Sequence, residues 1–393
     1  MRNTEKNSMD WDRELWPGMF SEPDWLIEPD VSVIPSLIQP YIPTQSPNRL
    51  SSPSDVDARS RPYRQTPPLE NIAVEAYKSG AYNKTYLVTV KADDFHTETS
   101  QHPQVYILRV TIPVDLWYKL ESEISTMSYV REHTSIPVPL VYAYDTSCDN
   151  TLGFEWMLME FIPGRKLSSR VRDDSMTLSQ QKECIVTVAG WLYQLSRLRF
   201  DAVGSIFYDW DTGRYTIGRA EDIVFVRDQC VKYSGADISR GPFRCFRDYF
   251  QAIVNITRAY YTDPVNIEAA EELQRLIDAG DRKAYNAAWW RPDQLTGWLP
   301  SHCTAVEKVL AALFPKNCDR GNKEMETQLY HHDAHGGNII VDEEGRPTAL
   351  IDWENVMARP VEMIDPEPKV LYMTLVEWGH KSHEDVDEEH EED

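Results

Sequence analysis

The chain has 393 residues, 41% of them hydrophobic, and a formal net charge of −23. This length suffices for two lobes with additional tails. The last ten residues, EDVDEEHEED, carry eight acids, and the rest of the chain is acidic as well. Such a protein would repel a phosphate backbone, so nucleic-acid binding is disfavoured. The charge is compatible with a cationic small-molecule substrate, although solubility explains it equally well.

Neither a membrane span nor a secretory signal is expected. No stretch approaches roughly 18 consecutive apolar residues, and the N-terminus MRNTEKNSMDWDREL has early charges and no apolar core. Its acidic character also argues against an Arg-rich transit peptide. The six cysteines are scattered without a CxxC pair, so neither a zinc ribbon nor a redox motif is expected. A reducing, cytoplasmic location is the default interpretation, and the oligomeric state is left open.

Residues 1–68 form a proline-rich N-terminal extension that contains 11 of the 25 prolines. Because proline interrupts helices and strand pairing, this segment is expected to be extended and partly disordered. Several of its side chains are too apolar for a purely solvated tail and predict an arm that packs on the body or on a second subunit: Trp11, Trp16, Phe20, Trp25, Leu26 and Ile27. The globular part is expected to begin near Leu69.

Residues 69–163 have the pattern of a small sheet that carries one helix. Four runs rich in β-branched and aromatic residues predict strands: Ala81–Val90, Val105–Thr111, Leu140–Tyr144 and Glu155–Phe161. The polar segment 92–103 predicts that the first two strands are adjacent and antiparallel. Leu116–Glu132 has apolar residues spaced by three or four, which indicates an amphipathic helix. The predicted order is strand, strand, helix, strand, strand.

Beyond Pro163-Gly164 the chain is predicted to be mainly helical, over residues 164–383, with an acidic tail at 384–393. The clearest amphipathic helices are Leu178–Leu198, Arg244–Tyr261 and Thr304–Leu313. A hairpin is predicted over Gly204–Ile217, with Asp211-Thr212-Gly213 at its turn. The fold class is therefore α+β: a small N-lobe built on an antiparallel sheet and a larger, mainly helical C-lobe.

The segment LYHHDAHGGNIIVDEEGRPTALIDWEN, residues 329–355, holds most of the chemical information. Two short apolar runs, Ile339–Val341 and Thr348–Ile351, flank a turn sequence and predict a hairpin. The hairpin would bring Asn338 at its entrance close to Asp352 at its exit, with Asp333 on the preceding loop. Oxygen ligands of this kind suit Mg²⁺, and a separate carboxylate suits proton acceptance from an attacking hydroxyl.

These motifs resemble those of the aminoglycoside phosphotransferase (APH) family, a branch of the protein-kinase-like superfamily, and especially its fungal members. The loop HHDAHGGN is similar to the family's H-G/x-D-x-x-x-x-N, and IDWE at 351–354 is similar to its I-D-W-E. The resemblance covers about residues 75–360 and implies a two-lobed kinase-like fold. It implies that Asp333 is the catalytic base, that Asn338 and Asp352 bind Mg²⁺, and that His331 supports the loop.

The resemblance also implies a nucleotide site in the N-lobe. The cofactor-binding residues that it implies are Gly80, Asn83, Arg109, Glu123, Met159, Glu160 and Ile162. Arg109, on the strand VYILRV, would contact the phosphates of ATP and pair with Glu123 on the following helix. The nucleotide loop, 78–84, has one glycine where protein kinases have several, and Arg109 stands where they have lysine. Both departures occur among APH relatives.

The expected activity is transfer of the γ-phosphoryl group of ATP to a hydroxyl or amine of a small molecule. One alternative is a nucleotide-binding pseudokinase that acts as an interaction module without turnover. A protein kinase is disfavoured because no A-P-E segment follows Asp352. The cluster His331, His332, Asp333 and His335 also suggests a metallohydrolase, but the spacing HxHxDH is absent. A simple turn would explain the loop by itself, but not together with IDWE.

Overall fold

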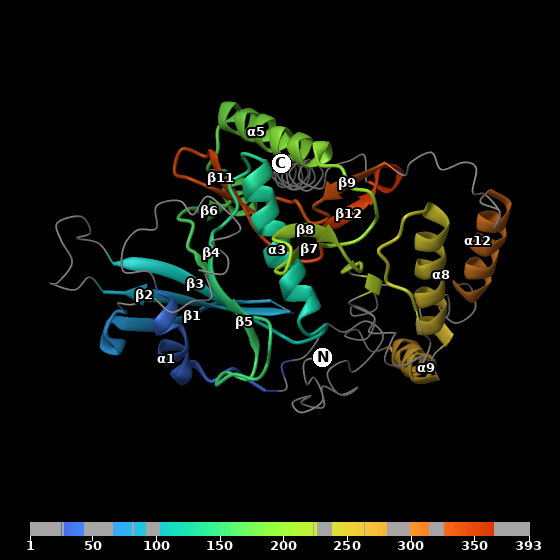
Figure 1. Cartoon of the computed structure of the whole chain (residues 1–393), viewed down its shortest axis with the longest axis horizontal. Helices are drawn as coiled ribbons and strands as arrows, with labels where there is room; N and C mark the ends of the chain where they lie inside the picture. The colour runs from blue at the N-terminus through green and yellow to red at the C-terminus, as the bar shows by residue number, and fades with distance from the viewer. Residues whose placement is uncertain are drawn as a thin grey trace, which may run out of the picture.

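The computed structural model describes residues 25, 27–42, 66–80, 82–91, 103–222, 224–225, 238–262, 264–280, 299–313 and 326–364. Within these residues the chain forms an N-lobe built on a sheet and a C-lobe of helices and short hairpins (Figure 1). The predicted α+β, kinase-like fold class is confirmed. No described helix is long and apolar enough to cross a membrane. The acidic tail at 384–393 lies outside the described residues.

The N-lobe sheet has five strands in the order β1-β2-β3-β5-β4, and all neighbours are antiparallel. Its strands are β1 (Ile72–Ser79), β2 (Asn83–Val90), β3 (Gln104–Thr111), β4 (Val141–Asp145) and β5 (Glu155–Glu160). The predicted antiparallel pairing of the strands at 81–90 and 105–111 is confirmed, with Thr85 opposite Arg109. Central strand β3 is buried along most of its length, as its apolar sequence VYILRVT requires.

Strand β1 was absent from the predicted order, which should begin with three strands instead of two. The sequence IAVEAYKS mixes charged and apolar residues, and only Ile72 is buried. An edge strand of this kind pairs on one side only and exposes most side chains, so it has no clear apolar alternation. This segment forms a strand because it pairs with β2, and its own sequence does not indicate a strand.

Part of the N-terminal segment packs on the N-lobe sheet. Helix α1 (Ile34–Ile38) buries Ile34 and Ile38 completely against the sheet residues of one apolar cluster. The ring of Trp25 lies 5.5 Å from the ring of Phe154. Trp11, Trp16, Phe20 and Leu26 lie outside the described residues.

Helix α3 (Tyr118–His133) lies where the prediction places it, but it is not a surface helix with a solvated polar face. Four of the expected apolar positions, Leu120, Ile124, Met127 and Val130, are buried, but the fifth, Leu116, precedes the helix and is exposed. Seven polar residues of the helix are buried too: Lys119, Glu121, Ser122, Glu123, Ser125, Thr126 and Ser128. Helix α3 lies beside the sheet, where its apolar residues share a core with β4 and β5, and it also contacts β7 of the C-lobe, so both lobes cover it (Figure 1). Polar groups buried in this way need partners, and two of them contribute to the site described below.

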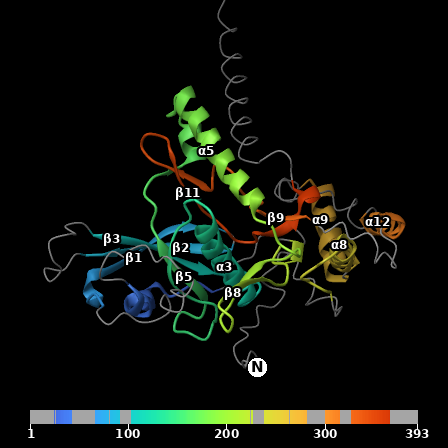
Figure 2. The same ribbon diagram turned by 45° about the horizontal axis from the view of Figure 1, so that its top comes forward.

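The C-lobe combines helices with short hairpins. Its helices are α4 (Leu167–Arg172), α5 (Leu178–Arg197), α8 (Phe246–Thr262), α9 (Pro264–Asp278) and α12 (Leu299–Leu313). Its strands are β6 (Arg165–Lys166), β7 (Ile206–Asp209), β8 (Arg214–Ile217), β9 (Thr327–Tyr330), β10 (Ile339–Val341), β11 (Pro347–Leu350) and β12 (Met357–Pro360). Helices α8, α9 and α12 group together on the side away from the N-lobe sheet in both views (Figures 1 and 2).

Most of the predicted C-lobe elements are confirmed. Helix α5 begins at a capping box in which Thr177 and Gln180 satisfy each other's backbone N–H groups. Helix α12 starts at Leu299, five residues before the predicted Thr304. The hairpin β7–β8 and the hairpin β10–β11 have the predicted positions, and Ile339 pairs with Leu350.

A third strand, β6, pairs with β10 and was not predicted. Gly164 precedes it with a positive φ of +136°, and a Cβ atom there would lie 2.4 Å from the carbonyl oxygen of Val341. Only glycine permits this close approach of the interlobe connection to the hairpin. Strand β6 therefore begins at a fixed place beside the loop that carries Asn338.

Candidate active site

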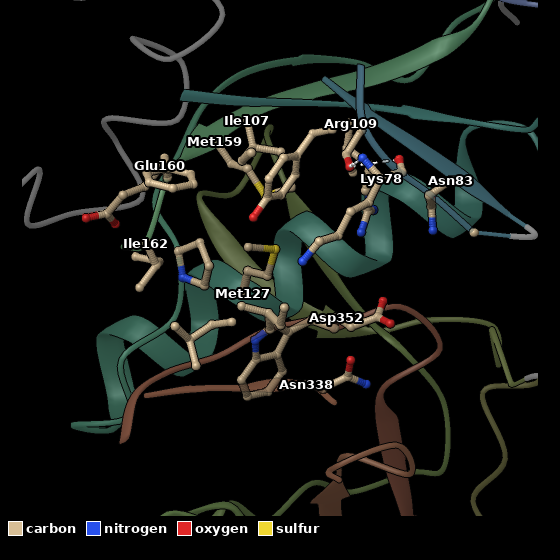
Figure 3. A pocket seen from close by; sticks show the side chains of 18 of the residues that line it. Lys78, Asn83, Ile107, Arg109, Met127, Met159, Glu160, Ile162, Asn338 and Asp352 are labelled. Carbon is tan, nitrogen blue, oxygen red and sulfur yellow. Dashed lines mark hydrogen bonds between the residues drawn. The ribbon is translucent and has the colours of Figure 1, made fainter. Parts of the chain in front are cut away.

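A cavity of about 450 Å³ lies between the two lobes (Figure 3). Nine of the residues that the sequence implicates line this cavity: Gly80, Asn83, Arg109, Glu123, Met159, Glu160, Ile162, Asn338 and Asp352. They come from strands β1 to β3, helix α3, the hinge 159–162 and the hairpin β10–β11. Asp333 and His331 are not lining residues; they lie on the loop behind Asn338. The structure therefore gathers the predicted residues from both lobes around one space.

One part of the cavity is apolar and suited to a flat ring. Its apolar lining includes Tyr77, Ile107, Met127, Met159, Phe161, Ile340 and Ile351. Tyr77 and Phe161 meet edge to face with their ring centroids 6.4 Å apart, which joins β1 to the hinge. The backbone N–H of Glu160 already donates to Leu140 O at 2.8 Å. A hinge donor for a base must therefore come from Phe161 or Ile162.

Arg109 and Glu123 form a bidentate ion pair on the N-lobe side of the cavity. Arg109 Nη1 donates to Glu123 Oε1 at 2.7 Å, and Nη2 donates to Oε2. Their side chains are only 7% and 1% exposed. The pairing expected from the resemblance is thus present. Arg109 Nε is buried and has no hydrogen-bond partner among the described residues.

A second buried ion pair joins the lobes and was not anticipated. Glu354, two positions after Asp352, accepts hydrogen bonds from Lys119 Nζ at 2.5 Å and from Asn83 Nδ2 at 2.9 Å. Thr111 Oγ1 donates to Asn83 Oδ1 at 2.9 Å, which fixes the amide orientation. Although burial alone would raise the pKa of Glu354, the cations Lys119 and Arg109 lower it to about 2.

This network connects residues that are 235 and 271 positions apart in the chain. Glu354 belongs to the IDWE motif, and membership of this motif was the one sequence feature that could have indicated a role for Glu354 in the site. Lys119 offered no signal, because a lysine in a helix sequence normally extends into solvent. The network ties the nucleotide loop and the start of α3 to the segment that carries Asp352.

Asn338 and Asp352 are the oxygen-bearing residues on the C-lobe side of the cavity (Figure 3). Asn338 Nδ2 donates to the backbone oxygen and to Oδ2 of Asp333, at 3.0 and 2.9 Å, so its Oδ1 is the atom able to bind a cation. Asp352 has a positive φ of 67°, an unfavourable backbone state for a residue other than glycine. Burial, followed by the negative charges of Glu354 and Glu123, raises the pKa of Asp352 to about 7.

These two residues fit Mg²⁺ by the chemistry of their donors. Mg²⁺ prefers oxygen ligands and is usually held by one or two carboxylates together with substrate phosphates. A cation beside Asp352 would stabilise its ionised form, which burial otherwise disfavours. No group of three or more His, Cys, Asp or Glu residues with metal-binding geometry occurs among the described residues. Asn338 and Asp352 would therefore fill only part of the coordination sphere of a bound Mg²⁺.

Asp333 is oriented by two neighbours on its own loop. Besides the bond from Asn338, its Oδ2 lies 3.3 Å from His335 Nε2. His335 Nδ1 accepts a hydrogen bond from the Gly337 N–H at 2.8 Å, so the proton of a neutral His335 ring is on Nε2 and faces Asp333. The Asp333 side chain is 35% exposed. The carboxylate is therefore open to solvent, and its contact with His335 is one that the sequence argument did not anticipate.

His331 connects this loop to the end of β11. Its Nε2 lies 3.3 Å from Ile351 O, and its ring meets the Trp353 ring edge to face with centroids 4.8 Å apart. Burial, followed by the positive charge of His332, lowers the pKa of His331 to about 3. His331 is therefore neutral at physiological pH, and its contacts hold the loop next to Asp352.

The fold and this site define a kinase-like protein with a nucleotide-sized interlobe cavity and an Asp-Asn-Asp cluster. The chain matches the Phosphotransferase enzyme family (APH) over residues 73–363. It belongs to this family, as its sequence motifs indicated.

Several known proteins are similar to it. A subtelomeric hrmA-associated cluster protein of Aspergillus fumigatus is 30% identical over 176 residues, which cover 42% of this chain and 32% of that protein. The mitochondrial protein Altered inheritance of mitochondria protein 9 of Zygosaccharomyces rouxii is 26% identical over 289 residues, covering 65% of this chain and 44% of that protein. The chain thus spans less than half the length of these relatives. A solved structure of aminoglycoside phosphotransferase APH(4)-Ia matches 73% of this chain and 69% of its own, with 14% identity and a TM-score of 0.35.

Proposed function

We propose that the protein is a Mg²⁺- and ATP-dependent phosphotransferase that moves the γ-phosphoryl group of ATP to a hydroxyl, or an amine, of a small molecule. The observation that carries this proposal is the convergence of two features on one cavity, with a third directly behind it. They are the buried Arg109–Glu123 pair, the oxygen ligands Asn338 and Asp352, and Asp333 bonded directly to Asn338. Family membership supports the phosphotransferase class.

The two ends of the cavity suit the two ends of ATP. The base lies in the apolar part between Ile107 and Ile340, and Phe161 or Ile162 supplies the backbone donor. Arg109 donates from its guanidinium to phosphate oxygens while Glu123 holds it in place. Mg²⁺, when bound, neutralises the developing negative charge on the phosphates, and Asn338 and Asp352 are the residues that would hold it.

Asp333 carries out the proton transfer. Its carboxylate accepts the proton of the acceptor hydroxyl as the acceptor oxygen forms a bond to the γ-phosphorus. The bond between this phosphorus and the β–γ bridging oxygen then breaks, and ADP leaves. Asn338 and His335 hold the carboxylate in place through the bonds described above.

The loop geometry favours a small acceptor over a peptide. Strand β12 begins at Met357, five positions after Asp352, and pairs with β9 directly before the catalytic loop. This short connection replaces the long segment on which protein kinases bind peptides. The histidines favour the kinase over the metallohydrolase interpretation, because His331 contacts Ile351 and Trp353 while His335 contacts Gly337.

The test is an ATP-consumption screen with purified full-length protein and Mg²⁺. Acceptors should include amino sugars, amino alcohols, nucleosides and hydroxylated amines, with Asp333→Asn protein as the blank. Acceptor-dependent ADP release, with a product heavier by one phosphoryl group in mass spectrometry, is expected from the wild type only. Nucleotide binding that is unaffected by Asp333→Asn, together with no turnover of any acceptor, would instead favour the pseudokinase alternative.

A further inference from the structure

Two lysines from opposite lobes line the cavity, and the catalytic scheme above uses neither of them. Lys78 comes from β1 in the N-lobe and Lys166 from β6 in the C-lobe. Within the described part of the chain, neither ammonium group forms a salt bridge with a carboxylate. Lys166 is half-buried, whereas Lys78 is exposed. Two cations without counterions in one cavity call for an explanation.

The position of Lys166 is fixed by its strand. Its backbone pairs with Ile340 of β10, two positions beyond Asn338. The close packing of Gly164 against Val341 leaves the strand little freedom. Burial and then the positive charge of Lys78 lower the pKa of Lys166, while the negative charge of Asp352 opposes this effect. Lys166 is therefore within electrostatic reach of Lys78 on one lobe and Asp352 on the other.

Three cations and three carboxylates line the cavity, but only one cation and one carboxylate among them form an ion pair. The charged lining residues are Lys78, Arg109, Glu123, Glu160, Lys166 and Asp352. Arg109 neutralises Glu123, and Glu160 at the hinge accepts the N–H of Leu140 at 3.1 Å. Lys78, Lys166 and Asp352 then remain outside any salt bridge within the described residues, and a bound Mg²⁺ would add further positive charge. The two unpaired ammonium groups and a bound Mg²⁺ would together outnumber the carboxylate of Asp352, and such a group of cations suits a polyanion.

We propose that Lys78 and Lys166 form a lysine clamp that binds the polyphosphate of the nucleotide from both lobes and makes the site selective for nucleoside di- and triphosphates over monophosphates. The inference rests on the proposed function, since it names additional ligands for the same nucleotide. A flexible ammonium on a long stem suits this task, because it binds phosphate as a point charge and adapts to different phosphate positions.

The test is calorimetric titration of the full-length protein with AMP, ADP and a non-hydrolysable ATP analogue, each with Mg²⁺ present. Lys166→Met is expected to weaken binding of ADP and the triphosphate roughly 10-fold to 100-fold and AMP by less than about 3-fold. Lys78→Met should act in the same direction with a smaller factor, because Lys78 is exposed. Lys166→Arg should retain most of the affinity. Lys182→Met, at an exposed position on α5, is the matched control and should change nothing.

Thermal unfolding of each variant separates binding from folding, and Lys166→Gln replaces Lys166→Met if the latter does not fold. Equal losses for AMP, ADP and the triphosphate would indicate a structural role and overturn the clamp, as would unchanged affinities. Binding that depends on both lysines but is accompanied by no acceptor phosphorylation would refute the proposed function alone. A wild-type protein that binds no nucleotide would refute both.

Discussion

On the N-lobe side of the cavity, Arg109 and Glu123 form an ion pair that solvent scarcely reaches, whereas on the C-lobe side Asp333, on the loop behind the lining residue Asn338, is one-third exposed. Asp333 is held by Asn338 and His335, two residues of its own loop. The first arrangement fixes permanent charges in a low-dielectric wall, which makes it expensive to disturb. The second arrangement holds the Asp333 carboxylate through hydrogen bonds from its own loop. The carboxylate therefore remains accessible to solvent, and these hydrogen bonds contribute little to stability. The two walls should therefore respond differently to mutation.

The largest expected effect is that of Arg109→Met, which leaves the buried Glu123 carboxylate without its partner. Breaking a buried ion pair in this way destabilises a protein by roughly 3–5 kcal/mol. Chemical denaturation should show this loss, and titration should show that nucleotide binding is lost as well. The double variant Arg109→Met/Glu123→Leu should recover much of the stability without recovering binding. A single variant as stable as the wild type would contradict the proposed difference between the walls.

Asp333→Asn tests the other wall. Because this change removes a general base but keeps the size and most hydrogen bonds of the side chain, turnover should fall about 1,000-fold while the unfolding midpoint stays the same. Steady-state kinetics with an acceptor from the screen, together with thermal unfolding, measure both quantities. Asp342→Asn, in the nearby hairpin turn, is the control and should retain wild-type turnover. Equal stability losses for Asp333→Asn and Arg109→Met would remove the distinction.

Glu155 on β5 should make the N-lobe sensitive to pH. Burial raises its pKa to about 8 from an ordinary value of 4.5, although the Trp117 N–H and the charge of Lys119 oppose the rise. As pH increases between these values, the unfolded chain releases a proton that the native protein keeps, so the free energy of unfolding falls. Glu155→Gln should flatten this fall by on the order of 2–4 kcal/mol between about pH 5 and pH 8.

Urea denaturation across this pH range measures the effect of Glu155. Glu183→Gln, at an exposed position on α5, removes the same charge from the surface and should leave the pH dependence as it is in the wild type. Parallel pH profiles for the wild type and Glu155→Gln would show that this carboxyl is ionised in the native state.

The smallest expected effect is that of His335→Ala. This change removes a single hydrogen bond to Asp333, so the turnover number should fall roughly 3-fold to 10-fold with no change in KM for ATP. His302→Ala on α12, a helix on the far side of the C-lobe, is the control (Figure 1). A rise in KM without a fall in turnover would place His335 in nucleotide binding and not in the positioning of Asp333.

Local spacing explains why the clustering of Asp333, Asn338 and Asp352 could be predicted. All three residues lie in one loop and the hairpin that follows it. Residues that are close in this part of the sequence are therefore also close in space. The strands at 83–90 and 104–111 were predictable for the same reason, since each has its own apolar pattern. Arg109 and Glu123 required the resemblance to known relatives, because nothing in a strand or helix pattern joins an arginine to a glutamate 14 positions later.

The sequence by itself determined the family, the α+β class and the cluster around Asp333, because these follow from short-range patterns and motifs. Only the tertiary structure decided that β1 is a strand, that the polar face of α3 is buried, and that Glu354 joins Lys119 and Asn83 across the lobes. It also placed Lys166 in the cavity. The physical reason is that burial and ion pairing depend on which distant segments of the chain come into contact. The local sequence around two residues that are 235 or 271 positions apart does not indicate that they will be in contact.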